Sequence, residues 1–547
     1  MFKGHPKGLI VAFFTNMGER FGFYTMMACL VFFLQARYSL PADKAGDIYS
    51  WFYFFIYALA LLGGFIADRK QNYKGTILIG IITMLAGYIV MSVPNLGLAI
   101  TIIGLFTIAF GNGLFKGNLQ ALVGQMYDDP KYDKLRDSAF SLFYMGINIG
   151  AFFAPSAANG IRNWFLRSRG YVYDADLPGL CNVYIAGALE NTTDLQRLAS
   201  KVTGKEVTDL AAFARDYMDV FSTGYNYAFG IAAAAMIVSL ITYLLFKQRL
   251  PDRRKQTEQS KQMVKMPWSE EKPRLIALML VFLVVIFFWM SFHQNGLTLS
   301  YFARDYTAKE AGAFTNLFFD IRSLLAVIAA IIGIVLLVRK ASRTVERTIG
   351  VILIVAGGLI TYYFYNRFGI SNPIEPEIFQ QFNPIFIVFL TPVVVWLFGW
   401  LRARNMEPST PRKIGFGMIL AAVAFVIMIF ASWKLLSPST LNAMPTPDRI
   451  SPYWLINTYL VLTIAELFLS PMGISFVSKV SPPRFQGLMQ GGWLGATAVG
   501  NKLLFVGSFM WVRIELWQLW LIFVICCLAS AAFIFSVLKR LERVTGS

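Results

Sequence analysis

The chain has 547 residues, of which 56% are hydrophobic, and its mean hydropathy is +0.55. Soluble globular domains contain a smaller share of apolar residues, so this composition excludes an ordinary soluble fold. The net charge of +18 does not indicate nucleic acid as a partner, because the basic residues follow the loops on one side of the apolar runs. We predict an all-α polytopic membrane protein.

Apolar runs long enough to cross a bilayer recur along the whole chain. There are about fourteen, and they cover approximately residues 9–35, 49–67, 76–93, 98–126, 139–159, 225–246, 275–302, 317–338, 349–365, 378–401, 414–433, 453–477, 486–511 and 516–538. With a cytoplasmic N-terminus, the inside loops and tails hold about 30 Lys and Arg against about 8 outside. We therefore expect a multi-pass protein of the cell membrane, surrounded by lipid, with both termini in the cytoplasm.

The first apolar run lacks a small-residue cleavage site, and Glu19 and Arg20 interrupt it. We expect it to be a retained helix and not a signal peptide. Cysteine usage predicts no disulfide framework, because only Cys181 lies outside the predicted spans and it has no partner there.

Two insertions interrupt an otherwise regular series of spans. Residues 160–224 form an outside segment, and within it 193–222 have the amphipathic spacing of a helix. The spans within residues 316–366 form a hairpin that leaves the orientation of the later spans unchanged. Without this hairpin, six spans precede and six come after a basic segment, residues 251–273, which we predict to be a cytoplasmic linker close to anionic lipid heads.

This arrangement is typical of the major facilitator fold, in which two six-helix bundles enclose a site near the midplane. We expect an N-terminal bundle over residues 1–250 and a C-terminal bundle over residues 274–547, with the hairpin as an addition to the second bundle.

The first span contains a pair of opposite charges at mid-membrane depth. Asn16, Glu19, Arg20 and Phe23 share one helical face, which must point into protein or a watery cavity. Ionisable residues inside a membrane are expensive, so they indicate a functional site. The structural alternative is an ion pair that only locks helices together.

Several stretches in both halves, taken together, resemble the proton-dependent oligopeptide transporter family. They are Glu19-Arg20-Phe21 with Phe23-Tyr24, Gly63-Gly64 through Asp68-Arg69, Gly111 through Asn118 with Gly124 through Tyr127, Phe143 through Gly150, Phe382-Asn383-Pro384, Glu466 through Pro471 with Gly473, and Gly492-Trp493. The resemblance covers both bundles and excludes the outside insert and the hairpin. It implies a secondary transporter that imports di- and tripeptides with protons and needs no cofactor.

The resemblance also implies a site for a zwitterion. Glu466 would bind the peptide ammonium with Asn148 and Asn383 around it, and Arg20 and Lys116 would face the carboxylate. Tyr24 and Tyr57 would bind the peptide backbone. Side-chain pockets would be walled by aromatic residues, namely Phe23, Trp289 and Trp493.

Proton coupling needs a group whose protonation changes with its neighbours. Glu19 is the first candidate, because a dry cavity alone would favour its neutral form and a neighbouring Arg20 or Lys116 would favour its ionised form. The sequence departs from the family pattern at Asn16, Met27 and His293, where a Glu, an Arg and a Glu are expected. His293 is therefore a second candidate for the coupling group, and a neutral His bonded to a neighbouring amide or carbonyl is the alternative.

Asp68 and Arg69 are predicted to form an inner gate latch, while Lys502 is left open as a cavity lysine. Other classes of function are a carrier of another zwitterion or anion, an uncoupled facilitator, a membrane enzyme and a peptide receptor. An enzyme is disfavoured because the chain has no His-Glu-x-x-His or Gly-x-Ser-x-Gly, and its two histidines exclude a histidine-rich metal site. A signalling receptor would need a cytoplasmic domain to pass on the signal. The inside segments are short and basic, so a receptor is disfavoured.

Overall fold

The computed structural model describes residues 2, 4–70, 72–132, 135–251, 266–339, 344–441, 444–482 and 485–545. In the first half of the chain the helices are α1 (Lys7–Tyr38), α2 (Ala42–Lys70), α3 (Tyr73–Ser92), α4 (Leu98–Gln125), α5 (Arg136–Ser168), α6 (Leu177–Ile185), α7 (Thr193–Thr203), α8 (Leu210–Phe246) and the 3-10 turn η2 (Lys247–Arg249).

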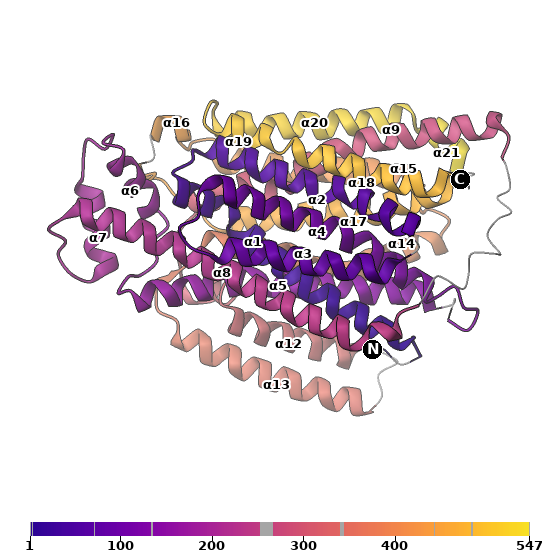
Figure 1. The fold of residues 1–547 in the computed structure, drawn as a ribbon, viewed down its shortest axis with the longest axis horizontal. Coiled ribbons are helices and arrows are strands. Elements are labelled where there is room, and N and C mark those ends of the chain that lie inside the picture. The colour runs from indigo at the N-terminus through magenta and orange to yellow at the C-terminus, as the bar shows by residue number, and fades with distance from the viewer. Residues whose placement is uncertain are drawn as a thin grey trace.

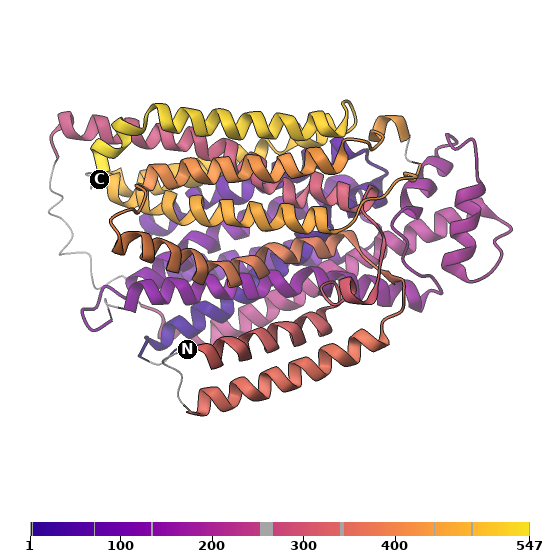
Figure 2. The same cartoon turned by 180° about the vertical axis from the view of Figure 1, so that it is seen from behind.

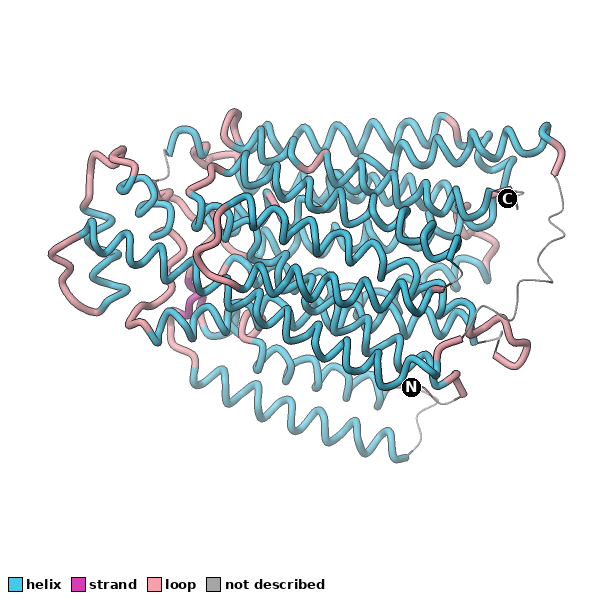
Figure 3. Tube along the Cα trace, in the orientation of Figure 1, coloured by secondary structure: helices cyan, strands magenta, loops and turns pink. Residues whose placement is uncertain are grey.

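The second half is also helical apart from one two-stranded ribbon. Its elements are α9 (Trp268–Phe292), η4 (His293–Gly296), α10 (Thr298–Asp305), β1 (Glu310–Ala311), α11 (Ala313–Asn316), α12 (Ile321–Val338), α13 (Thr344–Arg367), β2 (Asn372–Pro373), η5 (Pro376–Gln381), α14 (Phe382–Ala403), α15 (Thr410–Ser432), α16 (Pro438–Leu441), α17 (Tyr453–Val480), α18 (Gln486–Lys502), α19 (Phe505–Trp511), α20 (Leu516–Ser536) and α21 (Leu538–Thr545). Strands β1 and β2 pair antiparallel, with Glu310 opposite Pro373 (Figure 3).

The long helices run side by side along one axis, as a membrane-spanning bundle requires (Figure 1). Among the described residues, 13 helices are long and apolar enough to cross a membrane. These agree with the predicted spans in number and order except at residues 486–511, where the structure has two helices, α18 and α19, separated at residues 503–504. The predicted span 275–302 is also interrupted, by η4 between α9 and α10. The predicted all-α polytopic class is confirmed.

Two bundles account for the packing. In the first, α1 packs on α5 and α8, and α4 packs on α2 and α3; in the second, α15 packs on α17 and α20, and α9 packs on α18. The bundles meet where α2 contacts α18 and α19, and where α5 contacts η5 and α14. The predicted linker, residues 251–273, lies mostly outside the described residues.

Helices α6 and α7 project from one end of the bundle, which we call the insert end (Figures 1 and 2). The two chain ends lie toward the opposite end, which we call the terminal end. The insert is shorter than predicted, because α5 continues to Ser168 and α8 starts at Leu210. The apolar run that predicts the fifth span ends before the charged residue Arg162. In the structure this charge is buried and paired, so helix α5 continues past it.

The amphipathic helix predicted over residues 193–222 is two helices. Gly204 ends α7 in the left-handed conformation, with φ 68°, which glycine adopts without steric cost. The side chain of Asp209 then accepts hydrogen bonds from the amides of Ala211 and Ala212 and starts α8. The chain therefore turns between the two helices.

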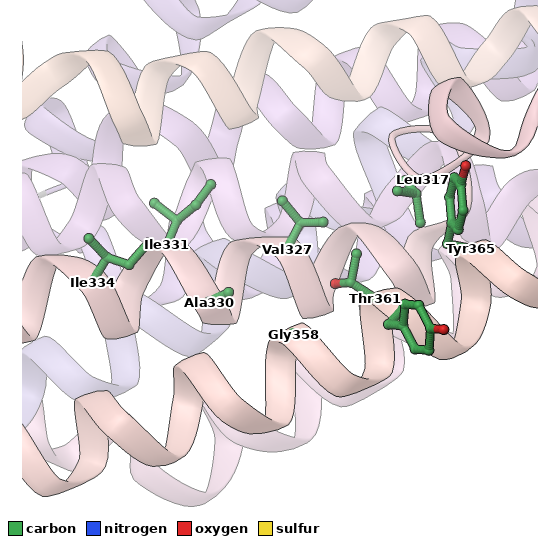
Figure 4. Close-up of a pocket in the computed structure, with 9 residues that line it drawn as sticks. Leu317, Val327, Ala330, Ile331, Ile334, Gly358, Thr361 and Tyr365 are labelled. Carbon is green, nitrogen blue, oxygen red and sulfur yellow. The ribbon is translucent and has the colours of Figure 1, made fainter.

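The predicted hairpin is present as α12 and α13, which pack mainly on each other at the side of the bundles (Figure 2). Small residues allow a close crossing: a Cβ on Gly357 would lie 2.6 Å from the Ala326 carbonyl oxygen. A mainly apolar cavity of about 420 Å³ lies between the two helices, with Val327, Ile331 and Tyr365 in its lining (Figure 4). The hairpin thus exposes most of its surface to the bilayer.

Helices α2 and α4 cross closely enough that glycine is required in α4. A Cβ on Gly113 would lie 2.6 Å from the Leu59 carbonyl oxygen, whereas a Cβ on Gly117, one turn further along the same helix, would meet nothing within 4 Å. We expect Gly113→Ala to destabilise the protein by about 1–3 kcal/mol through overpacking. Gly117→Ala is the matched control and should be neutral or stabilising by up to about 1 kcal/mol. Thermal unfolding of the two purified variants checks this, and equal melting temperatures would contradict it.

Candidate functional site

The charge pair predicted in the first span is fully buried and satisfied. Glu19 has no exposed surface and Arg20 is 4% exposed. The Arg20 guanidinium donates to both Glu19 carboxylate oxygens, at 2.5 and 2.6 Å, and the Asn112 side-chain amide on α4 donates to Glu19 at 2.7 Å. An acid at this depth is thus held by a cation and an amide from two helices.

Two further cation contacts lie on the same side of the interior. The Arg20 Cζ lies 4.7 Å from the centre of the Phe23 ring, and the Lys116 Nζ lies 4.1 Å above the Tyr57 ring. Such cation–π contacts are favourable where water is scarce. The two aromatic rings fix the positions of the cations but contribute no negative charge.

The second bundle contributes an acid. Glu466 lies halfway along α17, is 8% exposed and accepts a hydrogen bond of 3.0 Å from the Asn383 side chain. Asn383 also donates to the Thr463 hydroxyl at 3.0 Å, so its amide is held from two sides. Asn148 on α5 is buried and donates to the carbonyl oxygen of Tyr144 in its own helix.

The groups from the two bundles face a common space. Tyr24 and Tyr57 lie close enough to interact electrostatically with both Arg20 and Glu466, and Tyr144 interacts with Glu466 as well. The side chains of Tyr24, Tyr57, Lys116 and Asn383 are half-buried. The structure therefore brings most of the predicted binding residues together across the bundle interface.

Two opposite charges in this space have no ionic partner. Among the described residues, neither Lys116 nor Glu466 makes an ion pair: the lysine contacts an aromatic ring, and the acid contacts an amide. Buried charges are normally paired, because an unpaired charge in a medium of low dielectric constant is costly. A ligand with one positive and one negative group would satisfy both.

His293 lies in η4, where the predicted seventh span breaks between α9 and α10. Its Nδ1 lies 2.6 Å from the Asn501 amide oxygen, its ring stacks on Trp289 at 4.7 Å, and Tyr53 of the first bundle is 4.6 Å away. No acid contacts this ring among the described residues, and the nearby charge is that of Lys116. The position matches the alternative of a histidine bonded to an amide.

The last predicted wall residue, Trp493, is buried and packs against Gly473, where a Cβ would overlap its ring. Trp289 is also buried, and its indole N–H finds no acceptor in the described part of the chain. Both indoles therefore lie inside the second bundle and not on its lipid face.

Polar contacts between the bundles are confined to the insert end, among those whose two partners are both described. They include Lys502 with Asp47 at 2.5 Å and Arg513 with Asp43 at 3.0 Å. Lys502 is thus an interface residue and not a cavity lysine. Asp68 and Arg69 lie exposed at the terminal end of α2, and the Tyr73 hydroxyl donates to Asp68.

Sequence reasoning missed Asn112 and Asn501, which bind the two predicted coupling residues. Both are amides within apolar runs next to glycines, as in Gly111-Asn112-Gly113 and Gly500-Asn501. A polar residue inside a membrane span needs a hydrogen-bond partner, so an asparagine within an apolar run already indicates a buried polar contact. Their partners lie far away in sequence, so the pairing itself required the fold.

Three comparisons with known proteins agree. The model described as PTR2, POT family, matches residues 74–267 and 366–514. The chain is 27% identical to an uncharacterized transporter of Bacillus subtilis, covering 92% of this chain and 87% of that protein. It is 27% identical to a di-/tripeptide transporter of Lactococcus lactis, covering 92% and 89%, and 26% identical to peptide transporter YePEPT of Yersinia enterocolitica, covering 91% and 87%.

Solved structures show the same fold. The crystal structure of peptide transporter POT in complex with sulfate has a TM-score of 0.67 at 21% identity, covering 100% of this chain and 96% of that one. A POT family transporter in complex with 5-aminolevulinic acid also has a TM-score of 0.67, at 20% identity, covering 99% and 98%. The predicted major facilitator fold is confirmed.

The buried Glu19 and Arg20 pair generates a stability prediction. Arg20→Gln should cost about 3–5 kcal/mol, because it leaves the Glu19 carboxylate buried with only Asn112 as donor. Glu19→Gln together with Arg20→Gln should recover most of this loss, since no charge then remains unpaired. Thermal unfolding of the purified variants measures both, and a double variant no more stable than Arg20→Gln would contradict the prediction.

Proposed function

The chain belongs to the POT family, and from this membership and the geometry of the site we propose that it is a secondary transporter that imports di- and tripeptides with protons by alternating access. The related proteins of Lactococcus and Yersinia carry the names of peptide transporters. No step of this function requires catalysis or a cofactor. The proposed substrates are small peptides and protons.

The observation that carries the proposal is the pair of unpaired charges, Lys116 in the first bundle and Glu466 in the second. A short peptide is a zwitterion, so an ammonium at Glu466 and a carboxylate at Lys116 would neutralise both ends of the ligand and both side chains. Because the charges belong to different bundles, a ligand that contacts both also holds the bundles together.

The remaining predicted residues complete this site. Asn383 and Asn148 would surround the ammonium, and Arg20 would support the carboxylate from beside Lys116. The phenols of Tyr24 and Tyr57 would bind the peptide backbone. The walls would be apolar and aromatic, formed by Phe23, Trp289 and Trp493; such walls discriminate weakly between side chains.

Import requires that the site opens on each side in turn. The ion pairs that join the bundles lie at the insert end, which supports a state closed there. We place the insert end outside and both termini in the cytoplasm of a cell that carries the protein in its inner or plasma membrane, following the excess of basic residues in the terminal-end loops. Asp68 and Arg69 are then available at the inner end as a latch for the opposite state.

Glu19 is the better candidate for the coupling group. It lies beside Arg20, whose guanidinium would turn toward a peptide carboxylate, so ligand binding would change the charge that faces Glu19. Within the described part of the chain His293 lies near Lys116 and contacts no acid, so an imidazolium there would lack a counter-charge. Asn16 stands where the family pattern has a Glu, and the Glu19–Arg20 ion pair is present in spite of this difference.

A second candidate substrate is another small molecule with an amine and a carboxylate. One structurally similar POT family transporter is bound to 5-aminolevulinic acid, which has these two groups. The charges at Lys116 and Glu466 fit this chemistry as well, and the length of the ligand would distinguish the two. A membrane enzyme or receptor has no support in the site.

Uptake into liposomes tests the function. Purified protein should accumulate labelled dialanine against its gradient only when protons flow inward. Glu19→Gln should leave peptide exchange and abolish accumulation, because it keeps the shape of the side chain and removes its titration. His293→Gln is the matched comparison and should keep the pH dependence of uptake. Exchange without accumulation in the unmodified protein would exclude proton symport, and no exchange would exclude peptides.

Binding of an N-acetylated peptide tests the role of Glu466. The unmodified protein should prefer dialanine to N-acetyl-dialanine, because acetylation removes the ammonium. Glu466→Gln should reduce dialanine affinity by at least about tenfold and abolish this preference, since loss of a buried charged hydrogen bond costs about 2 kcal/mol or more. Asp194→Asn, on the exposed face of α7, is the control. A preserved preference in Glu466→Gln, measured by titration calorimetry, would remove Glu466 from the site.

A further inference from the structure

A buried ionic cluster joins the two bundles at the insert end. The Arg162 guanidinium on α5 donates from Nη2 to Glu375 at 2.7 Å and from Nη1 to Glu377, both next to α14. The Tyr225 hydroxyl on α8 donates to the same Glu377 oxygen at 2.9 Å. Arg162 and Glu377 have no exposed side-chain surface, and Glu375 is 16% exposed. We call Arg162, Tyr225, Glu375 and Glu377 the Arg162 cluster.

The charges in this cluster do not balance. With both carboxyls ionised, two negative charges share one guanidinium, and the sum is one negative charge in a buried place. The neighbouring titratable or charged groups are Cys29 of α1, Tyr173 of the insert, Arg304 and Asp305 of α10, Lys309 directly before β1, and Arg449 in the segment before α17. Arg304 pairs with Asp305, and Lys309 and Arg449 share Asp176, so among the described residues none of these three cations makes an ion pair with Glu375 or Glu377.

One oxygen of the cluster also lacks a donor. The Glu377 Oε2 atom is buried and has no hydrogen-bond partner in the part of the chain that the structure describes. An ionised carboxylate oxygen in this position is costly, and a neutral carboxyl is less so. Burial raises the pKa of the Glu375 carboxyl, which precedes the membrane-spanning segment, above its ordinary value in spite of the opposing charge of Arg162. Both features favour one bound proton.

The cluster borders a cavity at the insert end. A cavity of about 390 Å³ at the insert end has Tyr173, Tyr225 and Pro376 in its lining, together with Asp176 of the insert. Tyr225 belongs to the cluster, and the Tyr173 ring lies 4.0 Å from the Arg162 Cζ. The cluster thus reaches the wall of this cavity through the Tyr225 side chain, while Arg162, Glu375 and Glu377 are not in the lining.

We propose that Glu375 and Glu377 share one proton when the insert end is closed, and that this proton is taken from the outside solution as the bundles close. The inference rests on the proposed function, because it requires that the insert end also opens. In the open state both carboxyls are hydrated and ionised near neutral pH. Closing buries both beside one guanidinium, and a proton from outside binds to one carboxyl, so that the closed cluster is neutral.

The direction of the pH effect is set by this proton. The closed state binds one more proton than the open state, so acid outside favours closure, and the preference is lost as the pH rises above the shared pKa of the closed cluster. This site is separate from Glu19, which lies at mid-depth in α1. It would make closure of the outer gate respond to outside pH even without a peptide.

Distance measurement between spin labels tests the proposal without any substrate. Labels at Lys44→Cys and Lys434→Cys lie exposed at the insert end of different bundles. Cys526, the half-buried native cysteine, is replaced by serine, and the buried ones are retained. Between pH 8 and pH 5 the ratio of short to long distances should rise at least about tenfold, as expected for uptake of one proton across a window of one pH unit or more.

Glu377→Gln should stay closed at both pH values and lose most of this dependence, because Arg162 and Glu375 then balance. Glu375→Gln, at the more exposed edge, should behave alike and serves if the first variant does not fold. Asp47→Asn is the control: it removes the Lys502 ion pair, so it should lower the ratio of short to long distances by the same factor at both pH values and keep the change of that ratio with pH. A full pH dependence in both glutamine variants, or none in the unmodified protein, would overturn the proposal. Failure of peptide binding would instead affect only the proposed function.

Discussion

The cost of a charge away from water governs this protein. Each ionic group at mid-depth has to be paired, or has to face a space that a ligand or water enters. Glu19 and Arg20 follow the first rule, with Asn112 as a third partner. Lys116 and Glu466 follow the second. The distinction separates charges that another side chain neutralises from charges that no side chain among the described residues pairs with, although all of them occur in apolar helices.

The bundle interface depends on the same constraint. At the insert end cations of one bundle pair with acids of the other, as Lys502 and Asp47 do. Close packing adds to this, since a Cβ on Gly46 would overlap the Ser508 side chain and one on Gly296 would overlap the Tyr49 hydroxyl. Seals of this kind separate only if several contacts break together, which makes the two states of a gate discrete.

The sequence allowed prediction of the spans, the hairpin and the family, because apolar runs and motif order are local properties. It also indicated which helices carry the buried charges Glu19, Arg20 and Glu466. It did not reveal how far α5 extends, because Arg162 stays in the helix only through Glu375 and Glu377, which are more than 200 residues away. The break of the seventh span at His293 was hidden for the same reason: hydropathy continues across it, and only packing against Tyr49 and Asn501 shows the turn. Which charges remain unpaired is a property of the assembled fold.

The α12–α13 hairpin has a mechanical consequence. Its two helices pack mainly on each other and leave most of their surface to lipid. A rocking motion of the two bundles therefore breaks few contacts with the hairpin, which is joined to them mainly through its two chain connections. At the same time it widens the protein in the plane of the membrane, so the area that the protein displaces in the bilayer is set partly by a segment outside the two six-helix bundles.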